Sequence, residues 1–188
     1  MTAMLMRFAT AIMLVAVVGA PLPATAQAQK VPVARIAILD NQRIMRESSA
    51  AIDIKTQIDR QRQKYQDEIT KKEQELRNAD QELARQRTIL SPEAFAQKRS
   101  EFEGRYTQVQ RDVQARKREL DQAYEFGLRQ VQKAINGIIV ELAKEREFNI
   151  VLPRKQVIFA ETTMNITDDV LLRLNQKLPK VPIPLSQN

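Results

Sequence analysis

Apolar residues along this chain change their spacing several times, and each spacing predicts a different element. Residues 33–39 (VARIAIL) concentrate β-branched residues and predict a β-strand. Asp40 or Asn41 then offers an N-cap for a helix that begins near Gln42. The helical pattern continues from there with one interruption, at residues 88–97 (TILSPEAFAQ).

Apolar residues on either side of that interruption recur at a spacing of seven. Before it the series is Ile69, Leu76, Leu83 and Leu90, and after it the series is Phe95, Phe102 and Val109. With a companion series on each segment, this makes the narrow stripe of a coiled coil, whereas a helix on a globular core carries a wider apolar face. One uninterrupted coiled coil is the alternative, and it leaves the interruption unexplained.

The interruption has the features of a helix start. Ser91 is a good N-cap, Pro92 suits the first helical position, and Glu93 lies near the positive end of the helix dipole. Folding the chain back at this point aligns the two series without an offset. The pattern therefore predicts an antiparallel coiled-coil hairpin over residues 52–128, with its tip near Ser91 and Pro92.

Beyond Leu120 the apolar residues become denser, which predicts a packed core rather than a thin stripe. This denser set consists of Tyr124, Leu128, Val131, Ile135, Ile138, Ile139 and Leu142. Two strands are predicted next, over residues 148–152 and 156–161, followed by a short helix that Thr167 caps. Residues 179–188 (PKVPIPLSQN) are Pro-rich and predict a loose tail.

These elements predict an α+β fold, in which a small β-containing trimerisation body carries a long antiparallel α-helical coiled-coil hairpin arm. Residues 31–51 and 129–178 form the body, and residues 52–128 form the arm. A body this small has little core of its own, and oligomerisation commonly supplies more. We expect an oligomer to bury Ile36, Ile38, Val131, Ile135, Ile138, Ile139 and Leu142.

Residues 1–28 predict a secretory signal peptide. Arg7 precedes an apolar run over residues 8–19, and small residues then allow cleavage after Ala26 or Ala28. The run is too short to span a membrane as a helix, which disfavours the alternative of an uncleaved anchor. The chain contains no Cys, which excludes a lipoprotein and any disulfide. We therefore expect export of a mature chain that begins after this segment.

Composition narrows the possible chemistry. Charged residues make up 28% of the chain and aromatic residues 5%, and the chain contains only 4 Gly. This composition indicates long solvated helices. His and Cys are both absent, so the usual zinc ligands and nucleophile–base pairs are missing. The Asp168/Asp169 and Glu145/Glu147 pairs are better explained as charges near helix ends. We predict no enzymatic activity, no catalytic residue, no metal site and no cofactor.

The order of these features resembles the Skp/OmpH family of periplasmic chaperones. The signal peptide, the strand RIAILD, the polar hairpin and the terminal block NIVLPRKQVIFAETTMNITDDVLLRLN follow one another as in that family. The terminal block is the most specific part, since any coiled coil would share the composition of the hairpin. The resemblance implies a periplasmic homotrimer whose arms surround a cavity. It also implies an ATP-independent holdase that binds unfolded outer-membrane β-barrel proteins and prevents their aggregation.

Basic residues of the arm are the candidate client-binding surface under this resemblance. They are Lys71, Lys72, Arg77, Arg85, Arg87, Lys98, Arg99, Arg111, Arg116, Lys117 and Arg118. The formal net charge of +7 favours anionic partners, among them acidic client segments, lipopolysaccharide and anionic membrane surfaces. The alternative is that these residues are ordinary solvated flanks of a coiled coil. Gly104 and Gly127 each cost about 1 kcal/mol relative to Ala in a helix, which predicts a locally loosened arm.

Two other classes of function stay open from the sequence. A structural or adaptor hairpin protein of the cell envelope would share the arm, but such adaptors carry larger β-rich regions on both sides of it. A nucleic-acid binder would share the positive charge, but export and the interspersed acidic residues argue against one.

Overall fold

The structure is a computed structural model that describes residues 32–185, so the predicted signal peptide lies outside the described residues. The chain divides into two units, Met1–Val33 and Ala34–Asn188, and the second contains every described helix and strand. In chain order these elements are β1 (Ile36–Leu39), α1 (Asn41–Glu47), α2 (Ser49–Gln86), α3 (Pro92–Arg146), β2 (Ile150–Pro153), the 3₁₀ turns η1 (Arg154–Gln156) and η2 (Thr162–Met164), and α4 (Thr167–Lys177).

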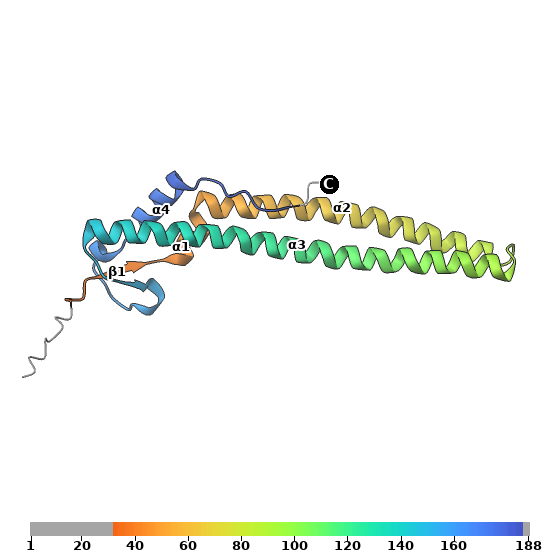
Figure 1. The fold of residues 1–188 in the computed structure, drawn as a ribbon, viewed down its shortest axis with the longest axis horizontal. Coiled ribbons are helices and arrows are strands. Elements are labelled where there is room, and N and C mark those ends of the chain that lie inside the picture. The colour runs from red at the N-terminus through yellow and green to blue at the C-terminus, as the bar shows by residue number, and fades with distance from the viewer. Residues whose placement is uncertain (1–31, 186–188) are drawn as a thin grey trace, which may run out of the picture. The chain divides into compact units, whose positions relative to one another are not determined.

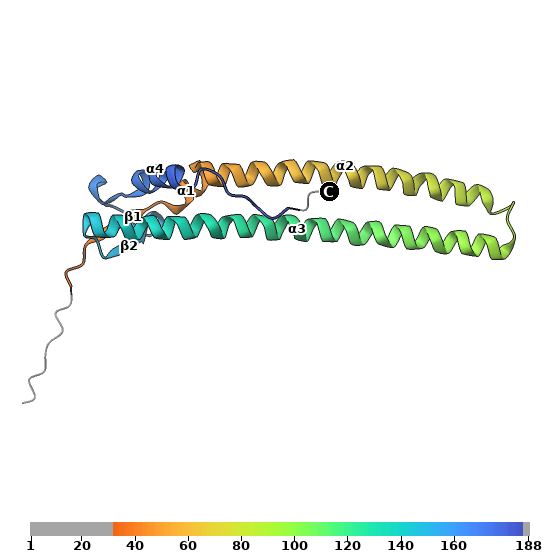
Figure 2. The same ribbon diagram turned by 45° about the horizontal axis from the view of Figure 1, so that its top comes forward.

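Two long helices dominate the second unit. α2 has 38 residues and α3 has 55, and they lie side by side in opposite directions, as Figures 1 and 2 show. At 1.5 Å per residue they are about 57 Å and 82 Å long. We call α2 and α3 together the helix pair. The other described elements gather at one end of it, where α3 extends past the start of α2 (Figure 1).

The reversal between the two helices has the predicted chemistry. Ser91 caps α3 by accepting a hydrogen bond from the backbone N–H of Ala94 at 3.3 Å, and Pro92 is the first helical residue. Glu93 lies in the first turn, close to the unpaired N–H groups of the helix start. The start of the second long helix is therefore confirmed.

A second break, at Ser48, was not predicted. α1 ends at Glu47, and the buried Ser48 starts α2 by accepting a hydrogen bond from the backbone N–H of Ala51. The backbone N–H of Ser49 donates to the side chain of Asn175 in α4 at 2.8 Å. The break therefore lets α1 end against α4 before the long helix begins.

β1 and β2 form a two-stranded parallel sheet, with Ile36 opposite Ile150 and Leu39 opposite Pro153. The predicted strand over residues 156–161 is wrong, because Gln156 is the last residue of η1 and residues 157–161 form a loop. One edge of β1 is taken by β2, and the other edge accepts a hydrogen bond from the backbone N–H of Ile166 at 2.9 Å. No edge of β1 remains for a third strand.

The start of α4 differs from the prediction in its cap. Thr167 is the first helical residue rather than the cap, and its hydroxyl accepts a hydrogen bond from the backbone N–H of Asp40 at 2.9 Å. The side chain of Asn165 accepts from the backbone N–H of Thr167 at 3.0 Å. Asp168 and Asp169 do lie in the first turn, as expected. The hydroxyl of Thr167 thus joins α4 to the β1–α1 junction.

One core fills the end of the helix pair where the strands lie. Its fully buried members come from every helix, among them Ile44, Ile54, Ile135, Leu142 and Leu174. The tail also belongs to this core. Val181 is 1% exposed, and Ile183 and Leu185 pack partly buried against the same cluster, which corrects the prediction of a loose tail for the described part of residues 179–188.

Gly127 is buried in this core rather than being a point of looseness. A Cβ atom at this position would lie 2.9 Å from Ile54 Cδ1 and 3.0 Å from Ile183 Cγ2. The same atom added at Gly104 or Gly137 would meet nothing within 4 Å. Close packing explains Gly127, since only a residue without a side chain lets Ile54 and Ile183 approach α3 this closely.

We expect Gly127→Ala to lower the free energy of unfolding by about 1 kcal/mol, because overpacking outweighs the gain in helix propensity. Gly137→Ala is the matched control in the same helix and should raise the free energy of unfolding by about 0.5 to 1 kcal/mol. Urea unfolding followed by circular dichroism measures both. Equal stabilisation by the two substitutions would contradict the close packing.

Candidate functional site

The helix pair is tightly packed near the strands and thinly packed beyond them. The buried residues of α2 are Ala50, Ile54, Ile58 and Tyr65, and none lies beyond Tyr65. Among residues 66–122, Val109 is the only buried residue. We call residues 66–122 the distal part of the helix pair. With so few buried apolar contacts, its local stability is expected to be low.

The distal part brings together the residues that the spacing of seven predicted to face each other. Leu76 and Val109 line the same hollows, and so do Leu83 and Phe102. These series residues other than Val109 stay partly exposed, so the seam between α2 and α3 is open to solvent along its sides.

Two wide hollows lie along one side of this seam, with volumes of about 580 and 500 Å³. They share Asp80, Phe102 and Glu103, so they form one continuous depression. Tyr106 lines it with half of its surface exposed. Aromatic rings flanked by charged side chains of both signs give this side an apolar floor and a polar rim.

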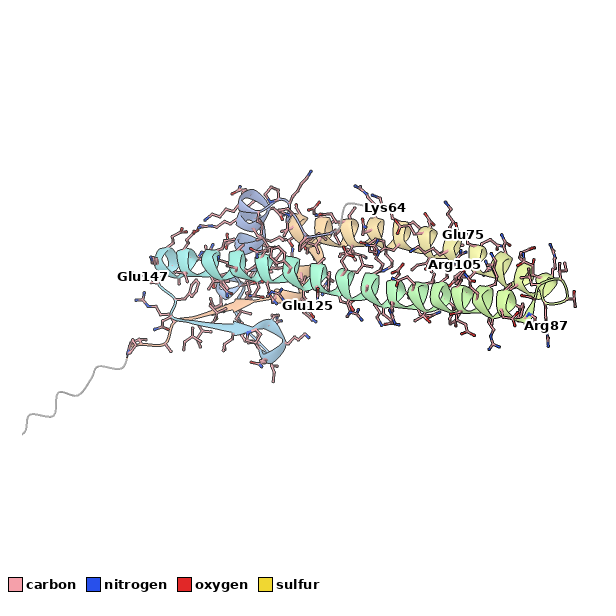
Figure 3. All side chains as sticks on the ribbon, turned by 45° about the vertical axis from the view of Figure 1, so that its right-hand side comes forward. Lys64, Glu75, Arg87, Arg105, Glu125 and Glu147 are labelled. Carbon is pink, nitrogen blue, oxygen red and sulfur yellow. The ribbon has the colours of Figure 1, made fainter. Side chains whose placement is uncertain are left out.

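The other side of the seam is narrower. Its hollows measure about 210 and 150 Å³ and share Ala79 and Arg105. Glu75 and Arg105 come from facing helices and line the larger of the two (Figure 3). The ammonium group of Lys72 donates to the Asp112 carboxylate across the pair at 2.5 Å. This bond, followed by one from Gln108, holds the pKa of the Asp112 carboxyl below its usual value. The two sides of the helix pair therefore differ in the volume of their hollows.

Tyr65 and Arg116 mark the boundary between the packed and the thin parts. The Arg116 guanidinium carbon lies 4.4 Å from the centre of the buried Tyr65 ring, a cation–π contact. Arg116 also forms ion pairs with Glu119 at 3.3 Å and Glu68 at 3.8 Å. Burial raises the pKa of the Tyr65 hydroxyl. These contacts tie α2 to α3 at the last point where the core fills the seam.

Most of the predicted client-binding cations are exposed, but several already have partners in the chain. Arg99 pairs with Glu103, and Arg85 pairs with Glu82. Arg77 donates to the side chain of Gln74. Within the described chain, no ion pair involves Lys71, Arg87, Lys98, Arg111, Lys117 or Arg118.

The charge of the helix pair is close to balanced. Its two helices contain 19 Lys and Arg and 17 Asp and Glu. The formal charge of +7 therefore comes mainly from the rest of the chain, and the helix pair exerts little net attraction on anions. The charge pattern of the sequence gives no indication of the aromatic floor of the wide depression. The aromatic residues Phe95, Phe102 and Tyr106, which recur along one face of the second long helix, are the feature of the sequence that indicates this floor.

The sequence matches a known protein family, and the fold matches a solved structure. The family described as outer membrane protein (OmpH-like) matches residues 35–174, well over half of the chain. The chain belongs to the OmpH-like family. No curated protein matches this OmpH-like chain. The crystal structure of a candidate outer membrane chaperone (OmpH-like) from Caulobacter crescentus is similar to this chain. The two superpose with a TM-score of 0.74, and their sequences are 20% identical. The alignment covers 84% of this chain and 95% of that chain, which shows a shared fold.

Residues predicted to form a trimer contact lie mainly inside this OmpH-like chain. Ile38, Val131, Ile135, Ile138 and Leu142 are buried in its own core, and Ile139 packs partly buried against it. Ile36 is also only partly exposed. Burial within one chain accounts for these apolar side chains without a partner, because the α1, α2 and α4 helices and the tail cover them.

Other apolar side chains of the body are exposed instead. Ile158 is fully exposed and Phe159 is 84% exposed, both in the loop that follows β2. The edge of β2 that faces away from β1 has no strand partner among residues 32–185. Near β2 the OmpH-like chain therefore exposes both apolar side chains and an unpaired strand edge.

Two further features, a membrane-spanning helix and a metal-binding cluster, are absent from the described residues. None of the helices between residues 32 and 185 is long and apolar enough to cross a membrane. In the same part of the chain, no three acidic, His or Cys side chains come together in a way that could hold a metal ion.

We expect Tyr65→Ala to lower the free energy of unfolding by about 3 kcal/mol, since it removes a buried ring. Leu83→Ala in the distal part should cost about 1 kcal/mol or less, because that side chain is already partly exposed. Urea unfolding of both variants tests this contrast. Similar losses at the two positions would show that the packed seam continues past Tyr65.

Proposed function

We propose that this OmpH-like protein is an ATP-independent holdase chaperone of the periplasm that binds unfolded outer-membrane proteins and prevents their aggregation. The observation that carries the proposal is the distal part of the helix pair, which offers a long exposed surface with an aromatic-floored depression. Membership of the OmpH-like family supports the link to outer-membrane proteins. The predicted signal peptide supports the periplasmic location.

A holdase requires surface rather than a reaction centre, because it acts by binding the unfolded state of its client. The open seam suits that role. Partly exposed aromatic rings contact apolar client side chains, and the mixed charges of the rim keep the protein soluble in the absence of a client. Thin packing lets α2 and α3 adjust to different clients at small cost. We accordingly propose no catalytic step and no cofactor.

We further propose that the helix pair is a coiled-coil arm and that three chains assemble through their bodies, with clients held between the arms. Support for assembly comes from Ile158, Phe159 and the open edge of β2. An exposed strand edge beside exposed apolar residues favours pairing with another chain. Three arms acting on one client would raise the effective concentration of weak contacts.

The proposed function predicts that the mature protein suppresses light scattering when a urea-unfolded outer-membrane β-barrel protein is diluted out of urea. One trimer per client should suffice. A variant with Phe102→Ser and Tyr106→Ser should protect several-fold less, because it loses the aromatic floor. Gln114→Ser, an exposed position outside the hollows, is the control and should protect fully. Undiminished aggregation with the wild-type protein would refute the holdase proposal.

The proposed assembly predicts that Ile158→Asp combined with Phe159→Asp converts trimers into monomers at micromolar concentration, because charges would enter an apolar contact. Ile89→Asp is the control, since Ile89 is also a largely exposed apolar residue and lies at the far end of the helix pair. Sedimentation velocity distinguishes the species. A wild-type monomer, or a trimer that survives the double substitution, would overturn this assembly.

A further inference from the structure

The end of the described chain is an extended segment whose side chains alternate between buried and exposed. Val181 is buried, Ile183 and Leu185 are partly buried, and the intervening Pro182 and Pro184 are exposed. This period of two is the pattern of a half-buried strand. The segment runs along the helix pair near the start of α2, as Figures 1 and 2 show.

Two side chains of α2 hold the main chain of this segment as a neighbouring strand would. The Asp53 carboxylate accepts a hydrogen bond from the backbone N–H of Val181 at 3.1 Å. The amide of Gln57 donates to the backbone carbonyl of Val181 at 2.8 Å, and it also donates to Asp53 at 2.7 Å. Asp53 and Gln57 are four residues apart, so they project from the same face of the helix. Both bonds go to backbone groups that every extended segment presents at a non-proline position.

The side chains of the segment enter an apolar seat built by both long helices. Ile183 reaches α3 at Gly127, where a Cβ atom would lie 3.0 Å from Ile183 Cγ2. Ile54 of α2 closes the same contact, and the partly buried Leu120 packs against the same core. We call the surface formed by Asp53, Ile54, Gln57 and Gly127 the seat. It combines main-chain recognition with room for large apolar side chains at alternate positions.

The family match covers the seat but not the segment that occupies it. The family match ends at residue 174, before the segment that occupies the seat. Asp53, Gln57 and Gly127 lie within the match, whereas Val181 and Ile183 lie outside it. The family match therefore covers the receiving surface and stops before the segment that occupies it.

We infer that the seat is a binding site for extended peptide segments that carry a large apolar side chain at every second position, and that the tail of the chain occupies it until such a segment displaces the tail. The inference rests on the proposed function for the identity of the natural ligand. Unfolded outer-membrane proteins are rich in segments of this kind, because their strands alternate lipid-facing and lumen-facing residues. The tail then acts as an internal competitor that keeps the apolar seat covered in the free chain.

Because the tail is tethered to the chain, only a ligand of sufficient effective concentration displaces it from the seat. A segment joined to the chain by a short linker competes at an effective concentration in the millimolar range. A single weak peptide is therefore excluded, whereas a client that binds the arms at several places gains enough local concentration to displace the tail. The seat would thus favour long unfolded chains over short peptides.

Peptide binding tests the seat without any client protein. The probe is a fluorescein-labelled peptide of residues 179–188, and the receptor is the chain shortened to end at residue 178. We expect binding by fluorescence anisotropy, and binding to the full chain weaker by at least about tenfold because the tail competes. The same peptide with Val181→Asp and Ile183→Asp is the control and should bind neither chain. Failure of the probe to bind a folded shortened chain would overturn the inference and leave the tail as a structural strap.

A second measurement uses the full chain, in case the shortened one does not fold. Methyl NMR signals of Val181 and Ile183 report whether the tail is seated. An excess of a peptide with Val, Ile and Leu at alternate positions and Thr between them should move both signals toward solvent-exposed values. Addition of a permuted peptide with the three apolar residues adjacent should leave them in place. Signals that stay fixed with the alternating peptide at saturating concentration would overturn the inference.

The peptide-binding test of the seat and the aggregation test of the holdase proposal can fail independently of each other. If the probe binds the shortened chain but the protein does not suppress aggregation, the seat stands and the holdase proposal fails. If aggregation is suppressed but neither peptide engages the seat, the holdase proposal stands and the seat fails. If both stand, the shortened chain should hold an unfolded β-barrel protein at least about threefold more tightly than the full chain does.

Discussion

The parallel pairing of β1 with β2 is the constraint on which the arrangement of the described chain depends. It joins Ile36 to Ile150, so the chain must leave the sheet, travel along α2, reverse, and return along α3. The return ends in the left-handed residue Glu147, which turns the chain from α3 into β2. The backbone N–H groups of Asn149 and Ile150 then donate to the carbonyl of Arg35. A few hydrogen bonds thus bring the two ends of a long excursion to one place.

The core follows from this closure. Once the ends of the excursion meet, α1, α4 and the beginning of α2 lie against the last third of α3, and their Ile, Leu and Val side chains exclude water together. Thr167, Ser48 and Asn175 satisfy the polar groups at the junctions between these elements. Beyond Tyr65 no further element among residues 32–185 covers the helix pair, so packing thins at that point and the seam opens. The same closure therefore produces a stable end and an adaptable end.

That contrast connects the fold to the proposed activity. A surface for unfolded clients must be apolar enough to bind them and polar enough to stay in solution alone. The distal part meets both conditions, with aromatic rings under a rim of balanced charge. At the packed end, the tail meets them differently, because it covers apolar surface with a segment of the chain itself. The distal part is open to clients at all times. Under the inference drawn above, the seat is open only after a client segment has displaced the tail.

Local patterns in the sequence determined much of this architecture. The spacing of seven, the Ser91–Pro92 helix start and the dense apolar set after Leu120 each depend on neighbouring residues along one helix, so they could be read without the tertiary structure. The facing of Leu76 with Val109 and of Leu83 with Phe102 followed from the position of the reversal alone. The terminal block pointed to the OmpH-like family on the order of its elements.

Tertiary structure decided what depends on partners distant in the chain. Residues 156–161 have the composition of a strand but find no free edge of β1, because β2 and the Asn165–Ile166 segment occupy both edges. Thr167 bonds to Asp40 rather than capping its own helix. Gly127 and the Pro-rich tail looked flexible in isolation, yet Ile54, Ile183, Asp53 and Gln57 meet there across more than 120 residues of sequence. The sequence alone determined the reversal and the register of the two long helices. The choice between an exposed and a buried apolar segment required the three-dimensional neighbours that compete for it.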